Sequence, residues 1–357
     1  MEEKVKISDI ARQSGVSTAT VSLALNNKSG VSQETRLRVL KVAEELDYPI
    51  KPATVTGKSN RLATVGMIVK TDHIPLSPQA HANPFYSKVM VGIEDVCRRN
   101  GINLLFATLP VDENNHPVEV PQLLYNDRMD GLLMVGAFVD ETIMSISGKH
   151  TPHIVLVDGY SNTESYDAVI SDNFHAAYQA IEYLIQKGHR HIGLVGSETN
   201  CYPSLQERRN GYIRALKENE ITDTYIANFN INITHGYEET VCLLKEHPQI
   251  TALFCVNDEI AFTAIRAAQD QGNRVPEDIS IIGYDDTYIA AKTRPSLTTM
   301  RVDTIAMGRA AVHLLSLRLD NPESARITMT IHPTMVERES AVAVRPNPVA
   351  EKKAIKS

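Results

Sequence analysis

Acidic residues follow two of the strands that the sequence predicts, and two aromatic residues come after the first predicted strand. Asp258 follows a β-rich run at 252–256 and begins a helix, and Asp158 ends another such run. Open α/β sheets bind ligands at the carboxyl ends of their parallel strands. A carboxylate can accept hydrogen bonds from two hydroxyl groups, and an aromatic side chain packs against the C–H face of a sugar. These two carboxylates, with Phe85 and Tyr86 as the aromatic wall, indicate a pocket for a polyhydroxylated small molecule.

Each of these residues also has a purely structural interpretation. Asp258 could cap the N-terminus of its helix, and Asp158 with Gly159 could form a turn. Phe85 and Tyr86 could pack in the core. The sequence leaves both interpretations open.

Motifs of common enzymes built on similar sheets are absent from the sequence. It has no G-x-G-x-x-G, G-x-x-x-x-G-K-S/T, H-E-x-x-H or G-x-S-x-G pattern. His189 and His191 resemble a metal-binding pair, but they flank Arg190 at the start of a strand with no third ligand nearby, which favours a structural role. The sequence therefore predicts neither an enzyme nor a metal or other cofactor.

The composition is that of a globular protein with an uneven charge distribution. Of 357 residues, 43% are hydrophobic and 22% are charged, which suits two or three packed domains. The net charge is −7, yet residues 1–61 carry ten Lys and Arg against seven Asp and Glu, so this segment is +3 and the remainder −10. A small basic module beside an acidic body is typical of a DNA-binding head on a sensor.

Signals for export or membrane insertion are missing. The N-terminus is acidic and polar, and no apolar run approaches the roughly 20 residues of a membrane helix. Four widely spaced cysteines predict small buried side chains in a reducing compartment: Cys97, Cys201, Cys242 and Cys255. We therefore expect a cytoplasmic protein.

The first 48 residues predict three short helices. A helix over 7–13 is followed by Gly15 in a tight turn, and Ser17 caps a second helix over 18–25. Ser32 caps a third helix over 33–47, with an apolar stripe of Leu37, Leu40, Ala43 and Leu46. The exposed face of the second helix carries small polar groups and no acids, as a helix entering the DNA major groove requires.

Residues 64–344 alternate β-rich and amphipathic helical runs. Expected strands are 64–69, 103–106, 131–135, 153–157, 191–195, 252–256 and 279–282, and expected helices are 84–100, 173–187, 204–219 and 258–271. This alternation predicts parallel sheets with helices on both faces. The rhythm restarts near residue 173, so we expect two doubly wound lobes with a ligand cleft between them.

Specific motifs in both parts resemble one family. The head contains Ile7-Ser8-Asp9-Ile10-Ala11, Gly15-Val16-Ser17-Thr18-Ala19-Thr20-Val21-Ser22, Asn26-Asn27, Val31-Ser32 and Thr35-Arg36. This pattern closely resembles the headpiece of the LacI/GalR family of bacterial transcription regulators. The body resembles that family's sensor, which is similar to periplasmic sugar-binding proteins, through Asn83-Pro84-Phe85-Tyr86, Arg208-Arg209-Asn210-Gly211-Tyr212, Val256-Asn257-Asp258 and Gly283-Tyr284-Asp285-Asp286. The resemblance covers nearly the whole chain.

The resemblance implies which residues of the head bind operator DNA. Thr18, Ala19 and Leu23 occupy base-reading positions. Positions that contact phosphate or support the helix are held by Ser17, Thr20, Ser22, Asn26, Ser32 and Thr35. The family usually has Arg where this chain has Leu23. Because Arg can hold a guanine edge by paired hydrogen bonds and Leu offers only apolar contact, we expect a different preferred operator.

The resemblance also implies an effector site in the cleft of the sensor. Asp258 matches the family's hydroxyl-binding Asp, Arg208 its cleft Arg, and Asp158 another polar position. Arg208 could instead be a surface residue on an exposed helix. Weaker candidates are Tyr160, Asn173, Tyr202 and Asp285. A sugar effector is expected, but the chain has no Trp and has Ile231 where many relatives have an aromatic residue, so a nucleobase is left open.

The domain scheme that follows is a head at 1–48, a hinge linker at 49–63, a sensor at 64–344 and a tail at 345–357. The family implies three crossings between lobes, placed near 166, 296 and 326; lobe 1 is then about 64–166 and 297–326, and lobe 2 about 167–296 and 327–344. The tail has no apolar heptads, which favours a homodimer over a tetramer.

The hinge is where the sequence departs most from the family. Relatives usually have a short helix ending in a Leu that wedges into the minor groove. Here Pro52, the β-branched run at 54–56 and Gly57 at the wedge position all oppose a helix. We expect an extended hinge whose contacts with phosphate or the minor groove are made by Lys51, Lys58 and Arg61.

Taken together, these patterns predict a sequence-specific repressor that binds operator DNA under the control of a small molecule. In the mechanism that the family implies, the effector changes the angle between the lobes and so alters the heads or the hinge. A transport-type binding protein is disfavoured, because the head is complete and no export signal precedes it.

Overall fold

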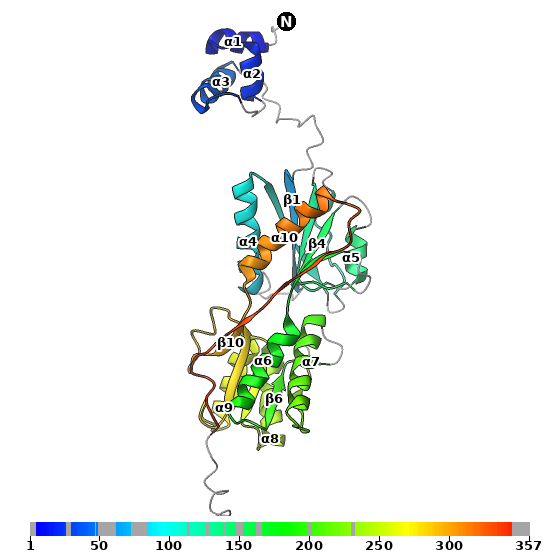
Figure 1. Ribbon diagram of the computed structural model, residues 1–357, viewed down its shortest axis with the longest axis vertical. Helices are drawn as coiled ribbons and strands as arrows, with labels where there is room; N and C mark the ends of the chain where they lie inside the picture. The colour runs from blue at the N-terminus through cyan, green and yellow to red at the C-terminus, as the bar shows by residue number, and fades with distance from the viewer. Residues whose placement is uncertain are drawn as a thin grey trace, which may run out of the picture. The chain divides into compact units, whose positions relative to one another are not determined.

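A computed structural model of the chain describes residues 5–25, 30–46, 48, 62–72, 84–112, 115–125, 129–138, 140–147, 153–161, 166–198, 202–229 and 233–344. The chain divides into two compact units, Met1–Asn60 and Arg61–Ser357 (Figure 1). Outside the described residues lie the predictions for Asn26, the hinge with Lys51, Lys58 and Arg61, Ile231, and the tail. Across the described parts of the chain, no helix is both long and apolar enough to span a bilayer.

The head is a three-helix unit made of α1 (Ile7–Ser14), α2 (Thr18–Leu25) and α3 (Gln33–Glu45). Gly15 ends α1 with a φ of 69°, the left-handed conformation that the turn requires. The Oγ atoms of Ser17 and Ser32 accept hydrogen bonds from backbone N–H groups three residues later, which caps α2 and α3 as predicted. The core consists of Ile10, Ala11, Val21, Ala24, Val39, Val42 and Ala43.

The apolar stripe predicted for α3 is wrong at Leu37. Its side chain is 62% exposed, whereas Val39, Val42 and Ala43 are buried. Helical residues turn by about 100° each, so Leu37 lies about 200° away from Val39 and faces out of the core. The buried face therefore begins two residues later than the leucine spacing indicated.

The first lobe of the sensor, lobe 1, contains a six-stranded sheet with the order β11-β5-β4-β3-β1-β2. Neighbouring strands of this sheet run parallel to one another. Its strands are β1 (Thr64–Asp72), β2 (Asn103–Val111), β3 (Gly131–Val135), β4 (Ile154–Val157), β5 (Asp167–Ser171) and β11 (Thr328–Ile331). Its helices are α4 (Pro84–Asn100), η2 (Gln122–Tyr125), α5 (Asp140–Ser147) and α10 (Thr304–Asp320), and α10 crosses α4 closely at two glycines, Gly92 and Gly308 (Figure 1).

The second lobe, lobe 2, has the strand order β12-β10-β9-β8-β6-β7, with β12 antiparallel to β10. Its strands are β6 (Ile192–Val195), β7 (Tyr225–Ala227), β8 (Ala252–Cys255), β9 (Ser280–Asp285), β10 (Thr298–Arg301) and β12 (Thr334–Val336). Its helices are α6 (Asn173–Gln186), α7 (Pro203–Glu218), α8 (Ile233–Glu246) and α9 (Asp258–Asp270), of which α6 packs on α7 and α8 on α9.

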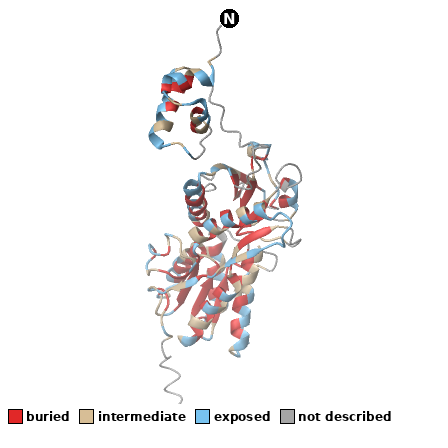
Figure 2. Ribbon diagram, turned by 45° about the horizontal axis from the view of Figure 1, so that its top comes forward, coloured by how far each residue is buried: buried red, intermediate tan, exposed pale blue. Residues whose placement is uncertain are grey.

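Both faces of the lobe 1 sheet are buried, as expected of doubly wound parallel sheets. Met67 and Val69 join one apolar cluster, and Ile68 between them joins another on the opposite face. Buried residues fill the central strands of both sheets in Figure 2. The predicted fold class, a helix-turn-helix head with a two-lobed α/β sensor, is confirmed.

The predicted crossings near 166, 296 and 326 each fall about six residues too early. The strands β5 and β11 belong to lobe 1, and β10 belongs to lobe 2. The chain therefore changes lobe at Asp172, at 302–303 and at 332–333. At the first crossing the physical reason lies in Asp167, which is fully buried and accepts hydrogen bonds from Arg318 of α10 and from the Ile327 backbone, so it anchors β5 in lobe 1. At the second crossing β10 pairs with β9 as far as Arg301, which keeps the chain in lobe 2 to that residue.

Candidate operator-reading face and effector site

The second helix of the head exposes small polar residues on one face. Ser17, Thr18, Ala19 and Ser22 are exposed, Thr20 and Leu23 are half-buried, and α2 contains no acidic residue. The face therefore carries no charge that would repel DNA, and its hydroxyls can donate to phosphates and base edges.

The N-termini of α2 and α3 are capped in the same way. The Ser17 hydroxyl lies 2.9 Å from that of Thr20, and the Ser32 hydroxyl lies 2.9 Å from that of Thr35. Each helix N-terminus carries a partial positive charge and hydroxyl groups, a combination that suits a phosphate oxygen. The structure thus brings Ser17, Thr20, Ser32 and Thr35 into positions compatible with the predicted phosphate contacts.

Leu23 differs from its neighbours on α2 because part of its side chain is packed. It is half-buried, and its Cδ1 lies 3.8 Å from the position that a Cβ on Gly30 would take. Packing beside Gly30 therefore leaves only part of Leu23 available to a base.

Six of the predicted effector residues of the sensor meet where the carboxyl ends of the two sheets face each other: Tyr86, Asp158, Tyr160, Asn173, Arg208 and Asp285. We call this group, together with Glu207 and Tyr284, the interlobe cluster. Tyr86, Asp158 and Tyr160 come from lobe 1, and the others come from lobe 2.

Asp158 follows β4 with a φ of 56° and is 8% exposed. The Tyr86 hydroxyl donates a 3.1 Å hydrogen bond to its Oδ2. Its Oδ1 is buried and accepts no hydrogen bond from any described residue. Burial raises the pKa of Asp158 to about 6, although the Arg208 charge and the Tyr86 bond oppose the shift. A role in a turn does not by itself explain a buried carboxylate with one oxygen that accepts no hydrogen bond.

Phe85 is buried in the core of lobe 1 and contacts the Tyr86 ring edge-on, with 5.4 Å between centroids. It therefore fits the core-packing interpretation, and Tyr86 alone reaches the polar groups. The expected two-residue aromatic wall is not what the structure forms.

Arg208 is buried on α7, so its interpretation as a surface residue is wrong. Its Nε donates to the Asn173 side chain at 2.9 Å, and its Nη1 donates to the Val256 carbonyl. The guanidinium lies 3.7 Å from the centroid of the Tyr284 ring, and Nη2 lies 3.7 Å from Asp285 Oδ1. Arg208 is thus held rigidly at the centre of the cluster by polar and aromatic contacts.

Asp285 ends β9 with a φ of 103°, a strained conformation for a residue other than glycine. Its Oδ1 is buried without a hydrogen bond from the described residues. Burial raises the pKa of Asp285 well above its usual range, and the Asp258 and Asp158 charges add to the rise while Arg208 opposes it. Backbone strain and a buried carboxylate oxygen that accepts no hydrogen bond, together at one residue, are typical of a functional site.

Hydrogen bonds across the cluster join the two lobes. The Tyr160 hydroxyl of lobe 1 donates to Glu207 at 2.8 Å and accepts from Asn173 at 3.0 Å. Near the cluster, Lys70 and Asn115 of lobe 1 both donate to the Tyr202 hydroxyl of lobe 2, at 3.1 and 3.2 Å. All three weaker candidates from this region, Tyr160, Asn173 and Tyr202, therefore take part in contacts between lobes.

The sequence missed Glu207, Tyr284, Lys70 and Asn115. Glu207 could have been found because it directly precedes Arg208, and Tyr284 because it directly precedes Asp285. Lys70 lies within β1, and Asn115 has a φ of 65° in a turn. No pattern in the sequence distinguishes Lys70 or Asn115 from ordinary surface residues.

Asp258 is placed differently from the expectation. It is fully buried, and its carboxylate accepts from the Thr299 hydroxyl at 2.6 Å and from the Thr287 backbone and hydroxyl at 2.6 and 3.1 Å. Asn257, not Asp258, caps α9 by accepting from the Ile260 backbone. Both oxygens of Asp258 are thus paired within lobe 2, so the structure offers no open hydroxyl-binding carboxylate there.

Two other features lie away from the cluster. His189 is buried, and its ring nitrogens form hydrogen bonds with the Thr251 hydroxyl and the Val342 carbonyl, which is a structural arrangement. The described residues hold no group of three His, Cys, Asp or Glu suited to a metal ion.

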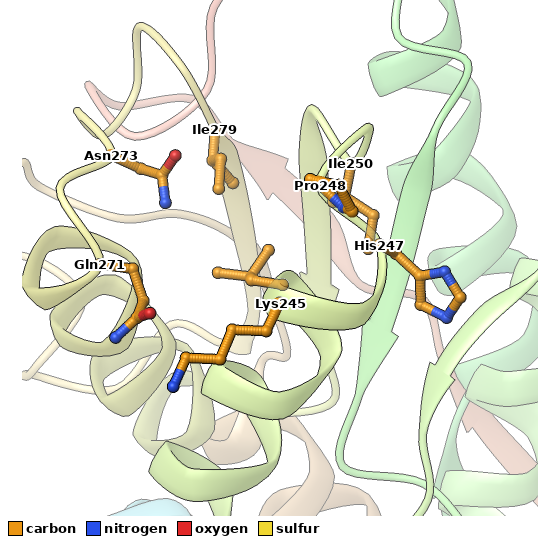
Figure 3. Close-up of a pocket in the computed structure, with 8 residues that line it drawn as sticks. Lys245, His247, Pro248, Ile250, Gln271, Asn273 and Ile279 are labelled. Atoms are coloured by element: carbon orange, nitrogen blue, oxygen red, sulfur yellow. The ribbon is translucent and has the colours of Figure 1, made fainter.

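A hollow of about 200 Å³ lies beside the end of α8 (Figure 3), lined by Leu244, Lys245, His247, Pro248, Ile250, Gln271, Asn273 and Ile279. None of these residues belongs to the interlobe cluster.

Comparison with protein families matches both parts of the chain. Residues 6–49 match the model described as bacterial regulatory proteins, lacI family, and residues 181–341 match the periplasmic binding protein-like domain. The head model and the sensor model occur in the same order as the two units of the structure.

Individual relatives match along nearly the whole chain. The HTH-type transcriptional repressor PurR of Aliivibrio salmonicida is 32% identical over 339 residues, covering 94% of this chain and 98% of the relative. The ribose operon repressor of Haemophilus influenzae is 32% identical over 343 residues, covering 94% and 98%. Among solved structures, a lac repressor dimer bound to operator and the anti-inducer ONPF aligns with a TM-score of 0.71 at 23% identity, covering 96% of this chain and all of that one.

These relatives are DNA-binding repressors and not enzymes. Their similarity extends through the head, whose α2 carries the polar face, and through the sensor, which carries the interlobe cluster. The chain therefore belongs to the LacI/GalR family of bacterial transcription regulators, as a DNA-binding transcriptional repressor.

Proposed function

We propose that this repressor binds a near-palindromic operator as a homodimer, and that a small polar molecule held in the interlobe cluster controls its affinity for DNA. Control by a small molecule is supported by one observation above all, the Asp158 carboxylate. It is buried between the lobes, and its Oδ1 accepts no hydrogen bond from any described residue. Buried carboxylate oxygens in proteins are normally hydrogen-bonded. A bound ligand would supply the missing donor.

On the DNA side, we propose that the head at 1–48 reads the operator and that the linker at 49–63 joins it to the sensor. Thr18, Ala19 and Leu23 would contact bases. Supporting and phosphate contacts would come from Ser17, Thr20, Ser22, Asn26, Ser32 and Thr35, with Lys51, Lys58 and Arg61 of the linker on the backbone or minor groove. Action on operator DNA implies a cytoplasmic protein.

A sugar or sugar derivative is the proposed effector class. The cluster offers carboxylates, a tyrosine hydroxyl and an arginine in a buried setting, which is the equipment that binds vicinal hydroxyls. Tyr86, Asp158, Arg208 and Asp285 are the proposed direct contacts, with Tyr160, Asn173 and Tyr202 at the border between lobes. A screen for the effector should include nucleobases as well as sugars.

Control of DNA binding follows if the ligand favours one arrangement of the lobes. The chain crosses between lobes three times, and the cluster adds hydrogen bonds between them. A ligand that bonds to both lobes stabilises the arrangement in which those groups are close. It can change operator affinity only by its difference in affinity for the two arrangements.

Gel shifts with an operator selected from random DNA would test the proposal. The wild-type protein should bind the selected site specifically, and a ligand found by thermal-shift screening should change that affinity. Arg208→Ala should keep operator binding and lose the ligand response, because the arginine lies in the sensor. If the folded Arg208→Ala protein responded like the wild type, the cluster would not be the effector site.

A further inference from the structure

Two of the three crossings between the lobes lie side by side, because the strands that lead into them are paired. Strand β5 runs parallel to β11, and the register places Ser171 opposite Ile331. The next residue of each strand belongs to a crossing, Asp172 to the first and His332 to the third. The Asp172 backbone N–H donates to the Ile331 carbonyl at 2.9 Å. Any bond between Asp172 and His332 therefore ties the first crossing to the third.

The Asp172 carboxylate is shared by two histidines. His175 Nδ1 lies 2.9 Å from Asp172 Oδ1, and His332 Nδ1 lies 3.0 Å from Asp172 Oδ2. An ionised carboxylate can only accept hydrogen bonds, so the His175 Nδ1 is the donor. The Oδ1 atom also accepts from the His175 backbone N–H at 3.2 Å, which caps α6. We call these three residues, Asp172, His175 and His332, the crossing clamp.

The charges that face Asp172 keep it ionised in the neutral range. Burial alone would raise the pKa of Asp172, but hydrogen bonds from His175 and the positive charges of His175 and His332 outweigh burial and lower it. Glu207 of α7 also faces this carboxylate: burial raises the pKa of Glu207, and the Asp172 charge adds to the rise. Within the clamp, the groups that change charge between pH 5 and pH 8 are therefore the histidines.

Both histidines are open to solvent protons. Their side chains are 69% and 77% exposed, whereas the side chain of Asp172 is 14% exposed. Hydrogen bonds between charged partners are roughly twice as strong as those between neutral ones. Protonation of the rings therefore strengthens both contacts with Asp172, and this added strength is lost as the pH rises through the range in which histidine titrates.

We propose that the crossing clamp makes the arrangement of the two lobes sensitive to pH: protonated histidines tie the first crossing to the third, and the tie loosens when they lose their protons. A rotation of one lobe against the other must bend all three crossings, so a bond between two of them opposes it. None of the three clamp residues belongs to the interlobe cluster. The clamp therefore gives the sensor a second input, the proton concentration, which acts without a bound ligand.

Hydrogen exchange of the full chain at pH 6 and pH 8 would test the proposal. Protection factors, which remove the intrinsic effect of pH on exchange, are compared for peptides over 171–176 and 302–307. The second range reports on the lobes, because the bonds from Thr304 to the Val302 carbonyl and from Ala306 to Asp303 lie in the second crossing, outside the clamp. From pH 6 to pH 8, wild-type protection should fall at least about threefold in both ranges, which two partly exposed ion pairs can supply.

Variants that cannot titrate locate the effect. A double variant, His175→Gln with His332→Gln, keeps side chains that can donate to Asp172, and its protection should be the same at both pH values. Asp172→Asn should give the same result and keep the cap of α6, because asparagine caps helices as well as aspartate does. His116→Gln is the matched control, since His116 lies 3.8 Å from Asp112 in an exposed pair of lobe 1, and it should behave like the wild type.

Two results would overturn the clamp. One is equal pH dependence in the wild type and the double variant, in which Glu207 is unchanged. The other is a change confined to 171–176, which would mean a local ion pair without effect on the lobes.

Gel shifts at pH 6 and pH 8 separate the clamp from the function proposed above. The ratio of the two operator affinities should differ at least about threefold between the wild type and the double variant. The expected exchange result without this difference would leave the clamp standing and refute control of DNA binding by the lobes.

Discussion

Arg301, the last residue of β10, donates a 2.6 Å hydrogen bond to Asp286, which directly follows Asp285 of the interlobe cluster. Arg338, beyond β12, donates to the other oxygen of Asp286 at 2.6 Å. Asp285 and Asp286 are consecutive residues with left-handed φ angles of 103° and 54°. A shift of Asp285 toward a ligand would therefore be transmitted to the strands beside the second and third crossings between lobes.

We predict that Asp286→Asn weakens the coupling between ligand and DNA more than it weakens either binding event. The amide keeps the shape of the side chain but loses the charge-assisted bonds to Arg301 and Arg338. Operator affinity measured without ligand, and ligand affinity measured without DNA, should each stay within about threefold of the wild-type value. The ligand-induced change in operator affinity should be about tenfold smaller than in the wild type, a factor within the usual range of allosteric coupling.

Asp278→Asn is the control for this prediction, because Asp278 is an exposed carboxylate of lobe 2 that also pairs with an arginine, Arg274. Gel-shift titrations with and without ligand measure both quantities. An Asp286→Asn protein with the full wild-type ligand response would show that the residue does not transmit the change.

Asp258→Ala is expected to destabilise the sensor, which differs from the role that its position in the sequence suggested. Removal of the carboxylate leaves the buried Thr299 hydroxyl and the two Thr287 donors without their acceptor. A buried donor left unpaired costs about 1–3 kcal/mol. The fully buried Thr299 hydroxyl bears this cost in full, and the two donors of the half-buried Thr287 add about 1 kcal/mol, so the free energy of unfolding should fall by about 2–4 kcal/mol. Urea titrations followed by circular dichroism measure it, with Asp270→Ala at the exposed end of α9 as the control. A loss of ligand binding at wild-type stability would restore Asp258 as a direct ligand contact.

The pH dependence of stability follows from the Asp158 carboxyl. Burial raises its pKa from 3.8 to about 6, so the folded protein holds this proton more tightly than the unfolded chain. This contribution to stability is present below pH 3.8 and is lost as the pH rises toward 6. It amounts to about 1.4 kcal/mol for each unit of pKa difference.

Asp158→Asn removes that titration. The stability of the variant relative to the wild type should therefore rise between pH 4.5 and pH 7 and should stay level above pH 7. Carboxylates with lowered pKa values, such as Asp167, Asp172 and Asp286, act in the opposite direction but are common to both proteins and cancel in the difference. A difference that does not vary with pH would mean that Asp158 titrates normally.

Local patterns predicted the fold well, and contacts between distant residues set the limits of the site prediction. The helix over 18–25 and the helix over 84–100 were predicted to the residue, because caps and periodicity are local. The first crossing was misplaced because β5 is anchored by Arg318, 151 residues further along the chain. Arg208 and Asp158 were found through strand ends and motif resemblance. The pairing of Asp258 with Thr287 and Thr299 depends on the packing of β9 and β10, which no local pattern reports.

The last prediction concerns Leu23 and the operator sequence. Leu23→Arg should change the preferred half-site more than it changes affinity for random DNA, because base contacts specify sequence while phosphate contacts supply most of the nonspecific affinity. The half-buried leucine packs near Gly30, so the arginine stem can keep part of that contact while its guanidinium reaches toward the groove. We expect a new preference for guanine at one position, worth about 1–3 kcal/mol against the other bases. Selection from random half-sites, run in parallel on wild type, Leu23→Arg and a Leu23→Met control, measures it. The same preferred site for wild type and Leu23→Arg would show that residue 23 does not contact a base.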